Sequence, residues 1–177
     1  MAQTTEPEQV DDRVKAIVKE AVQSIKQSVG KYRSTTQDQI RQAMKDKSID
    51  RKQLVGKVFY AEEPDSDYPM FGQTERLANG RMTMRTVSID HVDKTFSDST
   101  EECVWFLMGR LYVETGFGED GGKEFNLLIL DEVDENHTRS RLIDDEIAPF
   151  TWEVLEDQTR PIEMPSKPEG YRVVDPW

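Results

Sequence analysis

Apolar residues recur at three- and four-residue steps near the start of the chain. The repeat runs through Val10, Val14, Ile17, Val18, Ala21, Val22, Ile25 and Val29. This spacing places the side chains on one face of a helix. Thr5 and Glu8 have the spacing of a capping box, which marks the start of many helices. We therefore predict a helix over residues 6–29.

A second, shorter helix is predicted over residues 37–46. Thr36 and Gln39 form another capping-box pair, and Ile40 and Ala43 fall on one face. A short capped turn follows and ends at Gly56. The sequence thus predicts a helical segment over residues 1–57.

The pattern changes to strands after residue 57. Residues 58–60 form a short apolar run, and Asn79-Gly80 lies between two strand-like segments, 73–78 and 81–89. Asn-Gly is the preferred pair of a type I′ hairpin turn. Met82 and Met84 alternate with polar residues, but Val87 and Ile89 are out of phase with them, so we expect a β-bulge near residues 85–86.

The segment 102–115 fits either a helix or a strand. Its β-branched and aromatic residues favour a strand. The glycine-rich residues 116–122 would then connect it to a further strand over 124–133. We also expect one helical turn within 138–147 and a last strand over 150–155.

Four prolines in the last seventeen residues indicate an extended tail without a core of its own. The predicted fold is α+β, with an N-terminal helical hairpin, an antiparallel sheet of about four to six strands and this tail. The predicted organisation is a basic helical segment (1–57), an acidic β domain (58–157) and a proline-rich extended tail (158–177).

Charge is sorted along the same boundaries. The net charge is −12, yet residues 13–57 hold twelve Lys and Arg against four acidic residues. Residues 58–177 hold 27 acidic residues against eleven Lys and Arg. Opposite fields on one molecule favour particular partners and orientations. The sequence therefore predicts a protein that contacts other macromolecules.

The basic helical segment is the first candidate binding surface. Its candidate partner-binding residues are Lys15, Lys19, Lys26, Lys31, Arg33, Arg41 and Lys45. Clustered cations can bind phosphates, but only Tyr32 is available to stack on bases, and the acidic body would repel a nucleic acid. Docking onto an acidic protein surface and an ordinary solvated helix face both remain open, and nucleic acid is disfavoured.

Two acidic clusters and the tail are further candidates. The clusters comprise Asp131, Glu132, Asp134 and Glu135, and then Asp144, Asp145 and Glu146. They can be a solvated surface, a cation site or a mimic of nucleic acid, but the spacing of an EF-hand is absent. We predict no metal site. Tyr171 and Trp177 in the tail are candidate interface anchors, unless the tail folds back over its own sheet.

No pattern of catalytic or cofactor-binding residues is present. The glycine-rich segment lacks the order of a phosphate-binding loop, and the two histidines stand apart from the single cysteine. Cys103 lies in an apolar run typical of a core thiol. His91, between Asp90 and Asp93, has the neighbours of a general base but is better explained as a strand histidine. We predict no cofactor.

A lone cysteine fits a reducing compartment. No apolar run reaches the length of a transmembrane helix, and the first residues lack a secretory signal. We expect a cytoplasmic or virion location without membrane contact.

The leading function hypothesis is a non-enzymatic assembly or protein-interaction subunit, such as a structural component of a virion or other large complex, that forms homo- or hetero-oligomers. The alternative is an acidic inhibitor, such as an immunity or anti-defence protein, that blocks a basic site on its partner. A third hypothesis, a small enzyme or ligand-binding protein, requires a deep pocket near His91 and Trp105.

Overall fold

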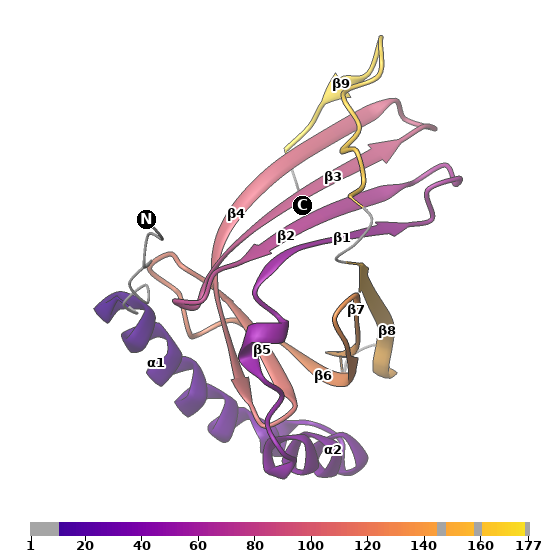
Figure 1. Cartoon of the computed structure of the whole chain (residues 1–177). Coiled ribbons are helices and arrows are strands. Elements are labelled where there is room, and N and C mark those ends of the chain that lie inside the picture. The colour runs from indigo at the N-terminus through magenta and orange to yellow at the C-terminus, as the bar shows by residue number, and fades with distance from the viewer. Residues whose placement is uncertain (1–10, 145–147, 158–160, 176–177) are drawn as a thin grey trace.

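A computed structural model describes residues 11–144, 148–157 and 161–175. It begins with two helices, α1 (Asp12–Ser28) and α2 (Ser34–Lys45), and continues into a strongly curled antiparallel sheet with the shape of a half-barrel (Figure 1). Short 3₁₀ turns follow each helix: η1 (Val29–Lys31) and η2 (Arg51–Gln53). The predicted α+β class, with two N-terminal helices before the sheet, is confirmed.

The first helix forms where the apolar repeat predicts it, because that stripe packs on the sheet. Its buried side chains are Val14, Ile17, Ala21 and Ile25. The side chain of Asp11 caps the helix, since its Oδ1 accepts a hydrogen bond of 2.7 Å from the backbone N–H of Val14. The expected cap, Thr5, lies outside the described residues.

The second helix starts earlier than predicted. It begins at Ser34, so Thr36 lies inside the first turn, where it is fully buried. The short turn that follows is capped by Asp50, whose Oδ1 accepts from the backbone N–H of Lys52 at 3.0 Å. The sequence therefore located both helices and placed their first residues less well.

Seven strands form an antiparallel meander in which each strand pairs with the next. They are β1 (Gly56–Glu62), β2 (Met70–Arg76), β3 (Arg81–Asp90), β4 (Thr95–Met108), β5 (Leu111–Gly116), β6 (Phe125–Val133) and β7 (His137–Asp144). Two more segments join the same sheet. β8 (Ala148–Asp157) pairs with β7 and meets β1 at one register pair, and β9 (Arg172–Val173) runs parallel to the start of β4.

The expected number of strands was too low because two segments were misassigned. Residues 102–115 are strand as predicted, but they contribute to two strands, β4 and β5, joined by a turn at Gly109 with φ +64°. Residues 137–144 form strand β7 and not a helical turn. Small buried hydroxyls at Thr138 and Ser140 occupy the inner positions of β7, so its alternation is not an apolar one.

The hairpin at Asn79-Gly80 is confirmed, but its turn type differs. The backbone N–H of Gly80 donates to the carbonyl of Leu77 at 3.1 Å, so Ala78 and Asn79 are the central residues. Asn79 does not have the positive φ that a type I′ turn needs, whereas Gly80 has φ +90°. The turn therefore closes one residue earlier than expected.

Two apolar clusters fill the two faces of the sheet near the helices. The outer cluster joins Ala21, Ile25 and Ile40 of the helices to Phe106, Leu111, Val113, Leu127 and Ile129 of the strands. The inner cluster comprises Leu54, Met82, Cys103, Trp105, Tyr112, Leu128 and Leu130. Alternate residues of β4, β5 and β6 thus face the helices or the inside of the curl.

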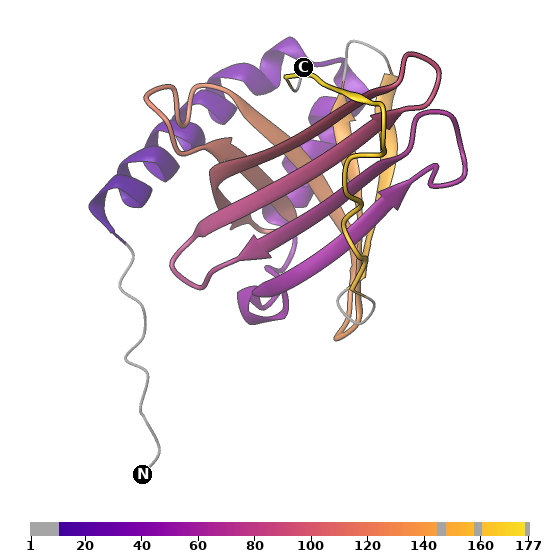
Figure 2. The same ribbon diagram turned by 90° about the horizontal axis from the view of Figure 1, so that it is seen from above.

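The C-terminal tail covers the outer face of the sheet away from the helices. Figure 2 shows the ribbon of the tail crossing this face of the sheet. Its Met164 and Tyr171 pack against Val87, Ile89 and Phe96. This cover explains the phase change in β3, whose register with both neighbours is unbroken. The expected bulge is therefore wrong. The first part of β3 buries the side chain of Met82 on the inner face, and the last part buries Val87 and Ile89 on the outer face.

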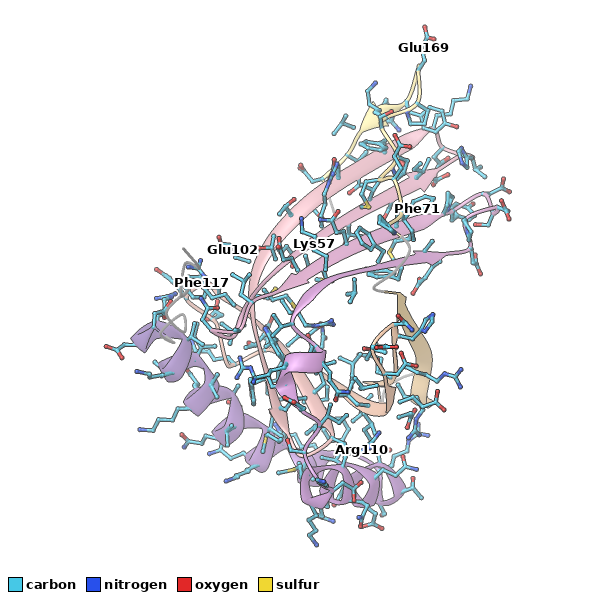
Figure 3. The ribbon with its side chains drawn as sticks, in the orientation of Figure 1. Lys57, Phe71, Glu102, Arg110, Phe117 and Glu169 are labelled. Carbon is cyan, nitrogen blue, oxygen red and sulfur yellow. The ribbon has the colours of Figure 1, made fainter. Side chains whose placement is uncertain are left out.

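Hydrogen bonds from two arginine residues help to hold the helices in place. Arg110 (Figure 3) donates its backbone N–H to the carbonyl of Ala43 in α2 at 2.8 Å, and its guanidinium donates to the carbonyls of Leu130 and Asp131. Arg13 of α1 donates to the carbonyl of Phe117 at 2.9 Å. The positions of α1 and α2 are thus fixed by directed bonds as well as by apolar burial.

Candidate interaction surfaces

The molecule has two ends with different surfaces. We call the end that carries α1, α2 and η2 the helical end. We call the opposite end, formed by the β1–β2 loop (63–69) and the β3–β4 turn (91–94), the distal end (Figure 1). The backbone N–H of His91 donates to the carbonyl of Asp67 at 2.8 Å, which joins these two connections.

The seven predicted cations all lie exposed at the helical end. Lys15, Lys19, Lys26, Lys31, Arg33, Arg41 and Lys45 come from α1, η1, the residue before α2, and α2. Lys15 Nζ lies 3.1 Å from Asp12 Oδ1, but both side chains are more than half exposed, so this pair contributes little. Two of the seven, Lys15 and Lys19, also line a concave site.

That site, which we call the cationic hollow, lies between α1 and the β2–β3 turn. Its volume is about 310 Å³, and it is lined by Val14, Lys15, Val18, Lys19, Arg51, Asn79, Gly80, Trp105 and Phe106. The α1 wall presents two valines and two lysines at helical spacing. The hollow therefore combines an apolar wall with three cationic groups.

Arg51 is the most constrained of these cations. Its guanidinium carbon lies 4.4 Å from the ring centroid of Trp105, in a cation–π contact. Its Nε is buried and has no hydrogen-bond partner in the described part of the chain. Burial lowers the pKa of Arg51 from its ordinary value. A positive charge is thus held beside the hollow, and no carboxylate of the described residues forms an ion pair with it.

Trp105 forms a rigid support for Arg51. The indole is fully buried, its Nε1 donates to the carbonyl of Leu77 at 3.1 Å, and its ring stacks on Tyr112. The Asn79-Gly80 turn packs against the same place, because a Cβ at Gly80 would lie 3.2 Å from Val14 and 3.1 Å from Arg51. The hollow is therefore built by segments distant in sequence.

The distal end carries carboxylates and apolar side chains together. Glu62, Glu63, Asp65 and Asp67 are exposed, and no ion pair joins them to another described residue. Asp90 and Asp93 lie on the neighbouring turn, and the nearby cations are Lys94, Lys167 and Arg172.

Three exposed large apolar side chains also gather there, and they are the exposed ones among the side chains that the structure describes. Tyr68 is 58 % exposed, Val92 59 % and Val173 69 %. Tyr68 and Val92 lie on the two joined connections, and Val173 pairs with Phe96 at the start of β4. Grouped exposed apolar residues are typical of an interaction surface. Sequence reasoning missed this grouping.

Hydrogen bonds fix the shape of the β1–β2 loop. The backbone N–H of Ser66 donates to the carbonyl of Glu63 at 2.9 Å, and that of Tyr68 donates to Ser66 Oγ at 3.0 Å. Glu63 has φ +44°, a left-handed conformation that a non-glycine residue rarely adopts. The loop therefore presents Tyr68 and its acidic neighbours in one defined conformation.

The first predicted acidic cluster stabilises its own hairpin. Arg141 donates to both oxygens of Asp131, at 2.6 and 2.8 Å. Glu132 lies 3.8 Å from Arg139. Asp134 accepts from the backbone N–H groups of residues 136 and 137, and these bonds lower its pKa. Glu135 is exposed.

The remaining predicted residues divide between the tail and the undescribed segments. Tyr171 packs on its own sheet, with its hydroxyl 2.8 Å from His91 Nδ1, so the fold-back of the tail is observed. Trp177, Asp145 and Glu146 lie outside the described residues, as does the side chain of Asp144.

The residues weighed for catalysis do not converge. Burial raises the pKa of the Cys103 thiol to about 11, with smaller effects from Glu114 and Glu101, so it stays protonated at neutral pH. His91 lies in the turn before β4 and Trp105 lies near the other end of that strand. The hollow that Trp105 lines does not include His91. Within the described ranges no three His, Cys, Asp or Glu side chains are grouped as metal ligands would be.

Comparison with known proteins found no matching family model, curated protein or solved structure. Among the described residues, no helix is both long enough and apolar enough to cross a membrane.

Proposed function

We propose that this protein is a non-enzymatic assembly or protein-interaction subunit, such as a structural component of a virion or another large complex. One observation carries the proposal: exposed cations gather at the helical end, while exposed carboxylates and apolar side chains gather at the distal end. Complementary charged surfaces steer association and fix the orientation of partners.

The distribution of buried and exposed apolar side chains supports this proposal. The stripe of α1 is buried against the sheet, and the inner face of the curl is filled around Trp105 and Tyr112. Among the side chains that the structure describes, the exposed large apolar ones lie at the distal end. Partner binding would then depend on the surfaces at the two ends.

Binding of defined charged polypeptides tests the proposal. Fluorescent poly-L-glutamate should bind the helical end, and poly-L-lysine the distal end, with affinities that fall when salt rises from about 0.1 M to 1 M. Lys26→Glu with Lys45→Glu should weaken only the first, and Glu62→Lys with Asp65→Lys only the second. Absence of binding, or binding unaffected by either pair of reversals, would contradict the proposal.

The alternative function is an acidic inhibitor, an immunity or anti-defence protein that blocks a basic site on a partner. The exposed carboxylates around Tyr68 favour it, because a carboxylate face with an apolar anchor suits a basic groove. In that case the distal reversals abolish capture of a basic partner, and reversals at the helical end leave capture intact.

A further inference from the structure

We propose that the cationic hollow of one copy receives the β1–β2 loop of a second copy. Tyr68 would lie against the apolar wall, and the carboxylates beside it would face Lys15, Lys19 and Arg51. This inference rests on the proposed function and names its partner as a second copy of the same chain.

The two surfaces complement each other in chemistry. The hollow offers the half-buried side chain of Val18, with buried Val14 behind it, beside three cations. One of these cations, Arg51, lies on the Trp105 ring and has no acidic partner among the described residues. The loop offers an aromatic ring that is 58 % exposed, with Asp65 and Asp67 close to it in sequence. Tyr is favoured as an anchor because one end of its ring is apolar and the other polar.

The fold prevents the β1–β2 loop of one copy from entering the hollow of the same copy. The β2–β3 turn, which lines the hollow, and the β1–β2 loop lie at opposite ends of the same strands. A contact between them therefore requires two molecules. Because the donor and acceptor surfaces differ, the contact is head-to-tail and leaves one free surface at each end of the pair, so it propagates to longer assemblies.

The net charge of −12 does not forbid this contact. The Debye length is about 10 Å at 0.1 M salt, so distant charges of the two copies are largely screened. The pairing of carboxylates with lysines inside the contact acts over shorter distances. Association is then governed by the residues that meet at the two surfaces.

Sedimentation of matched variants tests the inference. The full chain should form dimers and longer species at about 0.1 M NaCl, and these should dissociate toward 1 M. Two reversals in the hollow, Lys15→Glu with Lys19→Glu, should raise the dissociation constant at least about tenfold, as should Tyr68→Ser with Asp65→Lys. The control, Lys47→Glu with Lys57→Glu, makes the same charge change at exposed residues outside the hollow and should stay within about twofold of the unmodified chain.

A mixing experiment tests the head-to-tail arrangement. The hollow variant retains an intact loop and the loop variant an intact hollow, so an equimolar mixture should form dimers but no longer species. Failure of the mixture to dimerise overturns the arrangement, and equal effects of the hollow and control reversals overturn the assignment to the hollow.

The outcome for self-association separates this inference from the proposed function. A chain that stays monomeric at about 0.1 M salt and high concentration, yet binds poly-L-glutamate at its helical end, refutes the second copy as partner and supports the broader proposal. A monomeric chain that binds neither polypeptide refutes both.

Discussion

The contact between Tyr60 and Gly72 allows a direct test of packing on the inside of the curl. The register places Tyr60 of β1 opposite Gly72 of β2. A Cβ added to Gly72 would overlap with ring atoms Cε1 and Cζ of Tyr60. The ring therefore covers the bare backbone of the glycine, an arrangement that fixes the register of curved sheets. We predict that Gly72→Ala destabilises the fold.

Two opposing effects set the magnitude. Alanine in a strand is favoured over glycine by about 0.5–1 kcal/mol, because glycine loses more backbone entropy on folding. Forcing an extra methyl group into filled space costs about 1–3 kcal/mol. The overlap lies at the ring itself, so we expect the second effect to dominate, with a net loss of about 1–2 kcal/mol.

A double-mutant cycle isolates the contact. Urea unfolding followed by circular dichroism would be measured for the unmodified chain, Gly72→Ala, Tyr60→Ala and the double variant. In the Tyr60→Ala background the overlap is gone, so Gly72→Ala should become neutral or slightly stabilising. Gly116→Ala is the matched control, since a Cβ there meets no atom within 4 Å.

The coupling free energy decides the outcome. A value of about 1–3 kcal/mol between positions 60 and 72 is expected for groups in direct contact. Additive effects, within about 0.5 kcal/mol, would show that the ring does not occupy the space above Gly72 and would refute the reasoning.

Three further predictions concern single residues. Gly109→Ala should lower the free energy of unfolding by about 2 kcal/mol or more, because φ is +64° there and the new Cβ would collide with the carbonyl of Ala43. Thermal unfolding measures this loss. The Cys103 thiol should resist a thiol reagent at pH 8 until the chain unfolds. Because its pKa is raised from 9.0 to about 11, its contribution to stability is complete below pH 9 and is lost as the pH rises toward 11. Cys103→Ala should remove this loss of stability at high pH. Asp134→Asn should reduce the fall in the free energy of unfolding at low pH. The lowered pKa of Asp134 means that its contribution to stability is present above its ordinary pKa of 3.8 and lost as the pH falls below that value. An unchanged pH dependence would show that the turn does not need the charge.

Local patterns in the sequence predicted the helices and the hairpin well. The stripe of α1 and the Asn79-Gly80 pair depend on neighbours within a few residues, and both were located correctly. Strand β7 was missed because its buried positions include Thr138 and Ser140. An alternation of small hydroxyl residues with Arg139 and Arg141 carries the two-residue period of a strand, but it is invisible to a search for apolar residues.

The candidate surfaces depend on contacts that no local pattern reveals. The charge of α1 was evident, but the hollow also needs Arg51, Gly80 and Trp105, which strand pairing brings together. The distal grouping needs the β3–β4 turn beside the β1–β2 loop, a contact set by the register of β2 with β3. The predicted β-bulge in β3 was wrong for the same reason, because the tail that covers Val87 and Ile89 is distant in sequence.

The antiparallel order of β1, β2 and β3 explains why the two surfaces act independently. Successive turns of a meander alternate between its ends, so the β2–β3 turn reaches the hollow and the β1–β2 and β3–β4 connections meet at the distal end. Ten residues of β3 separate the ends by about 30 Å. That is several Debye lengths at about 0.15 M salt, where the Debye length is about 8 Å. A partner at either end therefore responds to the local charge, positive at one end and negative at the other, and not to the net charge of the whole chain.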